Sequence, residues 1–298
     1  MRRACIDIGS NTTRLLVADC DGEQLQEVHQ ARAFTHIRRG IEPDGTIAVA
    51  KLEEVVAVVE AHLRDAGTLD CEEVCCVATA AIRRAPNGSV LVAAIHDACG
   101  LATDVLSEQE EARLAFIGAA RTLGRSPAGP LGVVDVGGGS SELVVGTAPD
   151  AISWSASFEL GSGDLADEFL RSDPPSAAEL ARTRERIAAT LGAVEVPRPC
   201  EAVAVGGSAA SLHRLAGPRL DADAFARSLA VLSAERAGDV ARRFGLELER
   251  VRLLGAGLLI LEAASQAFGV SLQVGRGGLR EGVLLDRRHG YWKPTSQN

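Results

Sequence analysis

Short apolar runs enclose a polar loop at two places in the chain. Near the N-terminus, β-favouring runs at 4–6 and 15–17 flank a loop that contains Gly and Ser. The arrangement recurs mid-chain, where runs at 131–134 and 143–145 flank a second loop of this kind. Apolar runs joined by a short loop of turn residues predict a buried β-hairpin. The chain is therefore expected to contain the same strand–loop–strand unit twice.

The residues between the two hairpins alternate between helical and strand patterns. Apolar positions at helical spacing predict a helix over 50–64, a strand is expected at 73–78, and a second helix is expected near 90–99. Residues 79–87 are expected to form a strand end that leads into a turn with two arginines. This alternation is typical of an α/β domain.

A further helix is expected to begin at Ser107. Ser107 and Glu110 have the spacing of a capping box, which gives Glu110 a structural role. Glu108 and Glu111 remain without such a role. Glu111 lies one helical turn inside, where the positive end of the helix favours the ionised carboxylate that a base or water-orienting group needs.

The second half of the chain repeats this logic after a Pro- and Gly-containing link at 126–130. We place the domain boundary there, with one domain at 1–125 and the other at 126–298. The second domain is expected to contain a strand at 154–158, a capping box at Ser176 and Glu179 with Gly192 as the helix C-cap, a strand at 202–205 that ends in a glycine loop, and a last helix that packs back on the first domain.

The two hairpin loops carry the residue types that phosphate binding requires. Gly and Ser allow successive backbone N–H groups to approach an anion, and each loop is preceded by an Asp, which suits a divalent cation or a positioned water. A single loop of this kind is also compatible with an ordinary hairpin turn. Two copies favour related halves that face each other across a cleft, as in the actin-like ATPase and sugar-kinase superfamily.

Composition narrows the classes of function. The chain has 298 residues, 46% of them hydrophobic, which is enough for two domains with cores. Its net charge of −9 disfavours a general nucleic-acid binder. Its only lysines are Lys51 and Lys293, and the many arginines suit bidentate phosphate contacts, although genome composition produces the same bias.

Cysteines and apolar stretches bear on location. The seven cysteines show no paired zinc-knuckle spacing and are interpreted as reduced residues, mostly in the core, of a cytosolic protein. The longest apolar stretch, at 253–261, is too short to span a bilayer. A cleaved signal peptide would remove Asp7. We therefore expect a cytoplasmic protein without a membrane or nucleic-acid partner.

Five motifs together resemble the exopolyphosphatase and guanosine pentaphosphate phosphohydrolase (Ppx/GppA) family over nearly the whole chain. They are D-I-G-S-N from residue 7, A-T-A-A-I-R-R-A at 78–85, E-E-A-R-L at 110–114, D-V-G-G-G-S-S-E from residue 135 and G-L-R-E-G-V-L at 278–284. The resemblance implies an α/β fold of duplicated actin-like (ASKHA, ribonuclease H-like) domains flanking a central cleft. It also implies removal of terminal phosphate from polyphosphate or from pppGpp, with Mg²⁺ or alternatively Mn²⁺. Longer members add C-terminal helical domains, and we expect the shorter two-domain form here.

The resemblance also assigns roles by position. Glu111 is implied as the catalytic carboxylate that positions or deprotonates the attacking water. Metal or water ligands are implied at Asp7, Asp135 and Glu142. The implied phosphate-binding residues are Ser10, Asn11, Arg83, Gly138, Gly139 and Ser140, with Gly206, Gly207 and Ser208 near more distal phosphates or without a ligand contact. Glu142 and Arg83 also have plain alternatives, as an outward-facing strand residue and a solvated turn residue.

Two departures from the family pattern keep other functions open. Members commonly carry R-L-G-E-G where this chain has 36–40, and an Arg where it has Asp164. The loss of a positive charge would weaken long polyphosphate binding or change the substrate, unless Asp164 is only a residue in the first turn of a helix. The alternatives are a pppGpp 5′-phosphohydrolase, a small-molecule kinase of the superfamily and a non-enzymatic sensor of polyphosphate or (p)ppGpp. A homodimer is consistent with the short form.

Overall fold

The computed structural model describes residues 1–22, 24–147, 151–286 and 293–294. Its contacts divide the chain into two compact units, each with one mixed sheet. Unit 1 contains Met1–Gly118 and the residues from Leu279 onward, and unit 2 contains Ala119–Gly278. The division falls inside helix α4 (Glu108–Arg121), whereas the sequence placed a boundary at residue 125.

The sheet of unit 1 is built around the predicted hairpin. Strands β1 (Arg2–Ile8), β2 (Thr13–Asp21) and β3 (Gln24–Ala33) pair antiparallel, and β4 (Glu73–Ala78) and β5 (Thr103–Val105) continue the sheet in parallel from β1. The short β12 (Lys293–Pro294) pairs antiparallel with β4. The sheet of unit 2 repeats this order and these strand directions with β6 (Leu131–Val136), β7 (Ser141–Thr147), β8 (Ala151–Phe158), β9 (Glu201–Val205) and β11 (Leu272–Val274). An edge strand, β10 (Arg219–Leu220), pairs antiparallel with β11. The repeated topology confirms the duplication that the two loops predicted.

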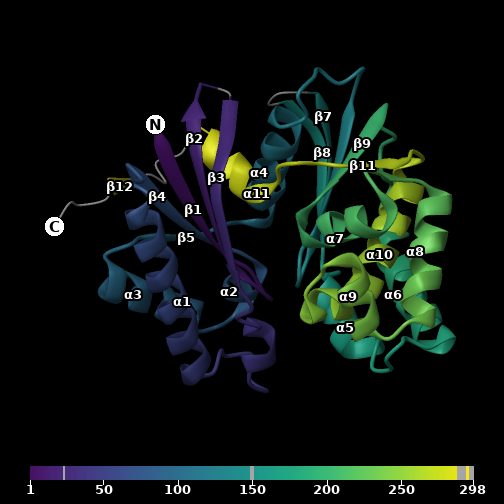
Figure 1. Ribbon diagram of the computed structural model, residues 1–298, viewed down its shortest axis with the longest axis horizontal. Coiled ribbons are helices and arrows are strands. Elements are labelled where there is room, and N and C mark those ends of the chain that lie inside the picture. Colours follow the sequence, from purple (N-terminus) through teal and green to yellow (C-terminus); the bar gives the residue numbers. More distant parts are fainter. Residues whose placement is uncertain (23, 148–150, 287–292, 295–298) are drawn as a thin grey trace. The chain divides into compact units, whose positions relative to one another are not determined.

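Two helical layers cover the sheet of unit 1. Helices α1 (Val49–Thr68) and α3 (Gly88–Cys99) pack on the face that carries Ile6 and Ile8. Residues of α4 and α11 (Leu279–Leu285) pack on the opposite face with Cys5 and Leu16. This alternation follows from the period of two in a strand, which sends Cys5 and Ile6 to opposite faces. Helix α11, the last helix among the described residues, therefore belongs to the core of unit 1 (Figure 1).

Unit 2 is organised around one long helix. Helix α10 (Leu248–Phe268) contacts α5 (Ser162–Phe169), α6 (Ala177–Leu191), α7 (Gly206–Ala216), α8 (Ala222–Ala234) and α9 (Ala237–Phe244) (Figure 1). Among the described residues, α10 alone is long and apolar enough to cross a membrane, but most of it is buried in this unit. The sequence analysis expected the apolar stretch at 253–261 to be too short to span a bilayer. The helix that contains it is longer, because α10 continues past both ends of that stretch.

Local signals in the sequence account for several element ends. The capping box at Ser176 and Glu179 is confirmed, and Gly192 is the C-cap of α6. The predicted turn at 79–87 is wrong, because residues 80–84 form the short helix α2 (Ala80–Arg84). Two alanines at its start favour helix, and the chain leaves the helix before Pro86.

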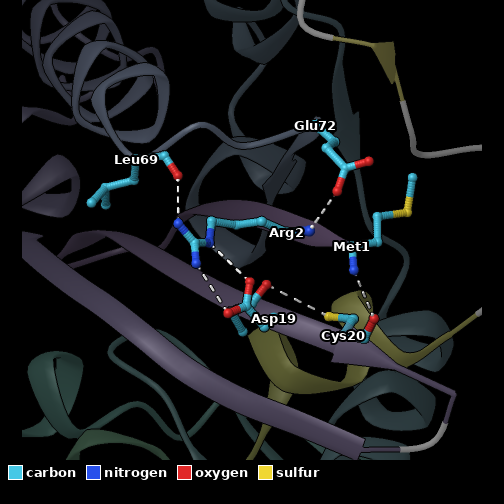
Figure 2. A network of polar contacts seen from close by, with 7 residues as sticks. Met1, Arg2, Asp19, Cys20, Leu69 and Glu72 are labelled. Carbon is cyan, nitrogen blue, oxygen red and sulfur yellow. Dashed lines mark hydrogen bonds and ion pairs between the residues drawn. The ribbon is translucent and has the colours of Figure 1, made fainter.

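Arg2 holds one end of the central strand β1 to its neighbours (Figure 2). Its Nε and Nη2 donate to the two carboxylate oxygens of Asp19, at 2.8 and 3.1 Å, and its Nη1 donates to the carbonyl of Leu69 at 2.9 Å. The backbone N–H of Arg2 donates to Glu72 at 3.0 Å. These contacts tie β1 to β2 and to the residues that follow α1.

All seven cysteines are free thiols. Four are buried, Cys20 and Cys99 are partly buried, and Cys200 is exposed. The interpretation of these residues as core cysteines therefore holds for Cys5, Cys71, Cys75 and Cys76 and fails for Cys200.

Candidate functional site

The first loop joins β1 to β2 and is closed by its own backbone. The N–H of Gly9 donates to the carbonyl of Thr12 at 3.0 Å, and Ser10 is 4% exposed. The segment after β3 supports the loop from outside, because the N–H groups of His36 and Arg38 donate to the carbonyls of Asn11 and Ser10 at 3.0 and 3.3 Å. The loop is thus held in place by residues more than twenty positions away.

Asp7 lies in β1, just before this loop. Its Oδ1 is buried and has no hydrogen-bond partner among the described residues. Burial raises the pKa of Asp7 above its usual value, Arg14 and Arg280 oppose that shift, and Glu281 adds to it. A buried carboxylate oxygen without a donor is costly unless a cation or water meets it. Asp7 therefore fits the predicted role of a metal or water ligand.

Glu111 is held at the start of α4 by an arginine. Arg83 Nη1 donates to Glu111 Oε2 at 2.9 Å and to the carbonyl of Leu106 at 2.7 Å. Glu111 is 8% exposed, and its backbone N–H donates to the carbonyl of Ser107 at 2.9 Å. The ion pair and the positive helix end both stabilise the charged carboxylate. A base that is fixed and charged is what activation of a water requires.

Arg83 retains a second donor group. Its Nη2 is buried without a hydrogen bond among the described residues, and it lies 3.8 Å from Glu108 Oε1. The arginine comes from α2 and not from the expected turn, and one half of its fork positions Glu111. The other half remains suited to an anionic oxygen.

The structure describes one half of the capping box predicted at Ser107 and Glu110. Its backbone N–H donates to Ser107 Oγ at 3.2 Å, and its two carboxylate oxygens accept from Nε and Nη2 of Arg113 at 2.8 and 2.6 Å. Arg113 also pairs with Asp286, directly after α11. The network ties Asp286, the residue that follows α11, to α4 within unit 1.

The second loop repeats the geometry of the first in unit 2. The N–H of Gly137 donates to the carbonyl of Ser140 at 2.9 Å, as Gly9 does to Thr12. The first turn of α5 is seated on this loop, because the N–H groups of Gly163 and Asp164 donate to the carbonyl of Gly138 at 3.0 and 3.2 Å. Asp164 is therefore in the first turn of a helix, and that turn contacts the loop.

Two predicted ligands are cross-strand neighbours in unit 2. Asp135 in β6 stands directly opposite Glu142 in β7, so their side chains leave the same face of the sheet. Glu142 is 2% exposed, and its Oε1 accepts from Ser157 Oγ at 3.0 Å. No group of three or more His, Cys, Asp or Glu side chains with metal-site geometry occurs in the described part of the chain. The pair suits Mg²⁺, which is commonly held by one or two carboxylates while phosphate and water supply the other oxygens.

The glycine loop after β9 meets Asp135. Gly206 has a φ of +82°, and a Cβ there would lie 2.3 Å from Asp135 Oδ1, so both conformation and space require glycine. The expected phosphate ligand Ser208 is placed differently. Its Oγ would lie 2.3 Å from a Cβ on Gly257 of α10, and the residue is 3% exposed. This hydroxyl packs against α10. Gly207 lies in the first turn of α7, and its role in phosphate binding stays a prediction.

The sequence reasoning missed the contribution of 36–40. These residues were noted as a departure from a pattern, and the structure places two of their N–H groups on the first loop. A left-handed residue before a 3₁₀ turn, η1 (Ile37–Gly40), makes that contact. The signal in the sequence was the departure from the family pattern at 36–40, a segment with two arginines and Gly40.

Comparison with known proteins agrees with this geometry. The profile of the Ppx/GppA phosphatase family matches residues 16–290. Exopolyphosphatase 1 of Mycobacterium leprae is 30% identical, over 96% of this chain and 89% of its own length. Exopolyphosphatase 2 of Mycobacterium tuberculosis is 34% identical, over 72% of this chain and 70% of its own.

Two solved structures have a similar fold. The crystal structure of the Aquifex aeolicus member of the Ppx/GppA family is 28% identical, with a TM-score of 0.80 over 96% of both chains. An exopolyphosphatase from Cytophaga hutchinsonii, 21% identical with a TM-score of 0.84 over 95% of this chain and 96% of its own, shows the same fold. The duplicated actin-like α/β fold predicted from the sequence is therefore confirmed. With the two closed loops, the paired carboxylates and a family match over most of its length, this chain belongs to the Ppx/GppA phosphatase family.

Proposed function

We propose that this protein hydrolyses terminal phosphoanhydride bonds and releases orthophosphate from inorganic polyphosphate. Family membership and relatives named exopolyphosphatase support the reaction. The observation that carries it is the ion pair between the partly buried Arg83 of α2 and Glu111 near the start of α4. Transfer of a phosphoryl group to water needs a positioned water and charge neutralisation more than covalent catalysis.

Glu111 is proposed as the group that orients and deprotonates the attacking water. Its carboxylate is 8% exposed and accepts a hydrogen bond from Arg83 Nη1 at 2.9 Å, a contact that favours its charged form. Arg83 Nη2 is proposed to donate to a phosphate oxygen, since it has no hydrogen-bond partner among the described residues. One arginine would thus align the base with the bond that breaks.

The two hairpin loops are proposed to bind phosphate oxygens. Ser10 and Asn11 supply donors in unit 1, and the backbone of Gly138, Gly139 and Ser140 supplies them in unit 2. Asp164 adds a negative charge to the helix turn on the second loop. That charge would disfavour a long polyanion, so we propose a preference for short polyphosphate.

Mg²⁺ is the proposed cofactor. Asp135 and Glu142 would hold it in unit 2, and the orphaned Oδ1 of Asp7 would meet a cation or its water in unit 1. When bound, the ion would neutralise charge on the phosphate oxygens. The protein contributes the placement of these carboxylates and the exclusion of water around Glu142.

The test is orthophosphate release with Mg²⁺ from long-chain polyphosphate, tripolyphosphate and pppGpp. Release from polyphosphate, faster for the short chain, is the expected result. Release from pppGpp alone would replace the polyphosphate assignment with the nucleotide one. No release from any of the three by folded protein would contradict the hydrolase proposal and favour a kinase or a sensor.

A further inference from the structure

The side chain of Asn11 is held by one residue outside its loop. Asn11 Oδ1 lies 2.7 Å from Nδ1 of His36. An amide oxygen can only accept, so Nδ1 of His36 is the donor. The contact commits the oxygen of Asn11 and fixes which end of the amide faces away from the histidine.

The other end of the amide lacks a partner. Asn11 Nδ2 is buried and makes no hydrogen bond to any described residue. A buried N–H donor without an acceptor carries a desolvation penalty, and that penalty disappears when a ligand oxygen accepts. The amide is therefore oriented to donate to an oxygen of a bound molecule.

The position of His36 is itself well defined. Its backbone is left-handed, with φ 42° and ψ 47°, which is uncommon for a residue with a Cβ. Its N–H donates to the carbonyl of Asn11 at 3.0 Å, and its ring stacks on Phe34 with centroids 5.6 Å apart. Arg32 covers Phe34 in turn, with Cζ 5.3 Å from the ring centre. The ring is thus supported by a neighbour, while backbone and side chain both contact Asn11.

We propose that His36 is a positioning residue for substrate, which holds the Asn11 amide so that Nδ2 donates to a phosphate oxygen. The inference rests on the proposed function, since it names a residue that supports the same phosphate-binding loop from outside. His36 itself touches no substrate. Its effect passes through Asn11, and it should therefore govern affinity for the phosphate chain more than turnover.

Three variants separate this role from a structural one. His36→Gly removes the ring and suits the left-handed backbone, so the fold should be retained. His36→Asn also tolerates that backbone and places an amide N–H the same number of bonds from the main chain as Nδ1. Asn11→Ala removes the proposed donor. His96→Asn, on an exposed histidine of α3, is the matched control.

The experiment measures KM and kcat for tripolyphosphate and its equilibrium binding by calorimetry, for these variants and for His36→Gly in the Asn11→Ala background. We expect His36→Gly to raise KM and Kd at least about tenfold with kcat within about twofold, His36→Asn to restore most of the affinity, and His96→Asn to change nothing. The cycle should be non-additive, with His36→Gly without effect once Asn11 is Ala.

Other results would overturn the inference. Unchanged affinity in His36→Gly, additive effects in the double variant, or a loss confined to kcat would each show that His36 does not act through Asn11. If wild-type protein binds tripolyphosphate but does not hydrolyse it, the proposed function fails, and the binding data still decide the role of His36. If wild-type protein does not bind tripolyphosphate at all, both proposals fail.

Discussion

At Gly282, helix α11 lies directly against the backbone of α4 within unit 1. A Cβ built on it would lie 1.8 Å from the carbonyl oxygen of Leu114 in α4, whereas real Cβ atoms stay at least 3.0 Å from such an atom. The obstacle is backbone inside a helix, so it cannot rotate aside. Gly282→Ala therefore requires α11 to move away from α4 by at least about 1.2 Å.

The cost of that movement can be worked from the residues beside it. Val283 and Leu284 are 0 and 1% exposed and belong to the cluster that contains Leu114. Overpacking costs about 1–3 kcal/mol, and complete exposure of each of these two side chains would cost about 1.5–3 kcal/mol. Partial retention of both contacts gives an expected loss of about 3 kcal/mol for Gly282→Ala.

Urea unfolding followed by circular dichroism measures the loss, and hydrogen exchange of peptides from β1 and β2 shows whether it falls on unit 1. Gly67→Ala is the matched control, because Gly67 lies in α1 and a Cβ there meets nothing within 4 Å. That variant should be as stable as wild type or gain up to about 1 kcal/mol. A Gly282→Ala protein that unfolds at the wild-type urea concentration would refute the packing argument.

Three further variants test single residues. Glu179 accepts hydrogen bonds from the N–H groups of 171, 172 and 176, which lowers its pKa to about 2. Glu179→Gln should therefore cost about 2 kcal/mol of stability at pH 7, and the difference from wild type should shrink as pH falls from about 4.5 towards 2. Equal urea midpoints of the two proteins at pH 7 would contradict this. Burial raises the pKa of Asp7, so its charged form opposes folding near neutral pH. Asp7→Asn should melt no lower than wild type yet lose phosphate release. A lower melting temperature would count against Asp7 as a ligand of a metal or water. Ser208→Ala should leave KM for tripolyphosphate within about twofold, since the hydroxyl packs against α10; a tenfold rise would return Ser208 to the site.

Much of the fold follows from short-range signals. The two hairpins and the capping box of α6 depend on apolar period, turn residues and side-chain caps, which act within a few residues. The return of α11 to unit 1 was expected only as packing of a last helix. Its reason lies in a contact between Gly282 and Leu114 that no local pattern reveals.

The candidate site also contains residues that local sequence signals identify and residues that only the fold reveals. The spacing from Ser107 separated Glu110 from Glu111, and the structure gives these neighbours different partners, Arg113 and Arg83. Motif position alone could not tell that Ser208 faces α10, because the direction of a side chain depends on what packs against its helix. In the sequence, His36 was only part of a segment that departs from the family pattern. Its role as a positioning residue follows from its contact with Asn11 in the structure.

The measurement that most directly tests the central claim is single-turnover orthophosphate release by wild-type protein and by Glu111→Gln, with tripolyphosphate, Mg²⁺ and binding measured in parallel. Gln keeps the size of the side chain and an oxygen that can accept from Arg83, but it cannot take a proton from water. The account predicts wild-type affinity with release slowed by about a hundredfold or more. Unimpaired release by folded Glu111→Gln would show that another group activates the water.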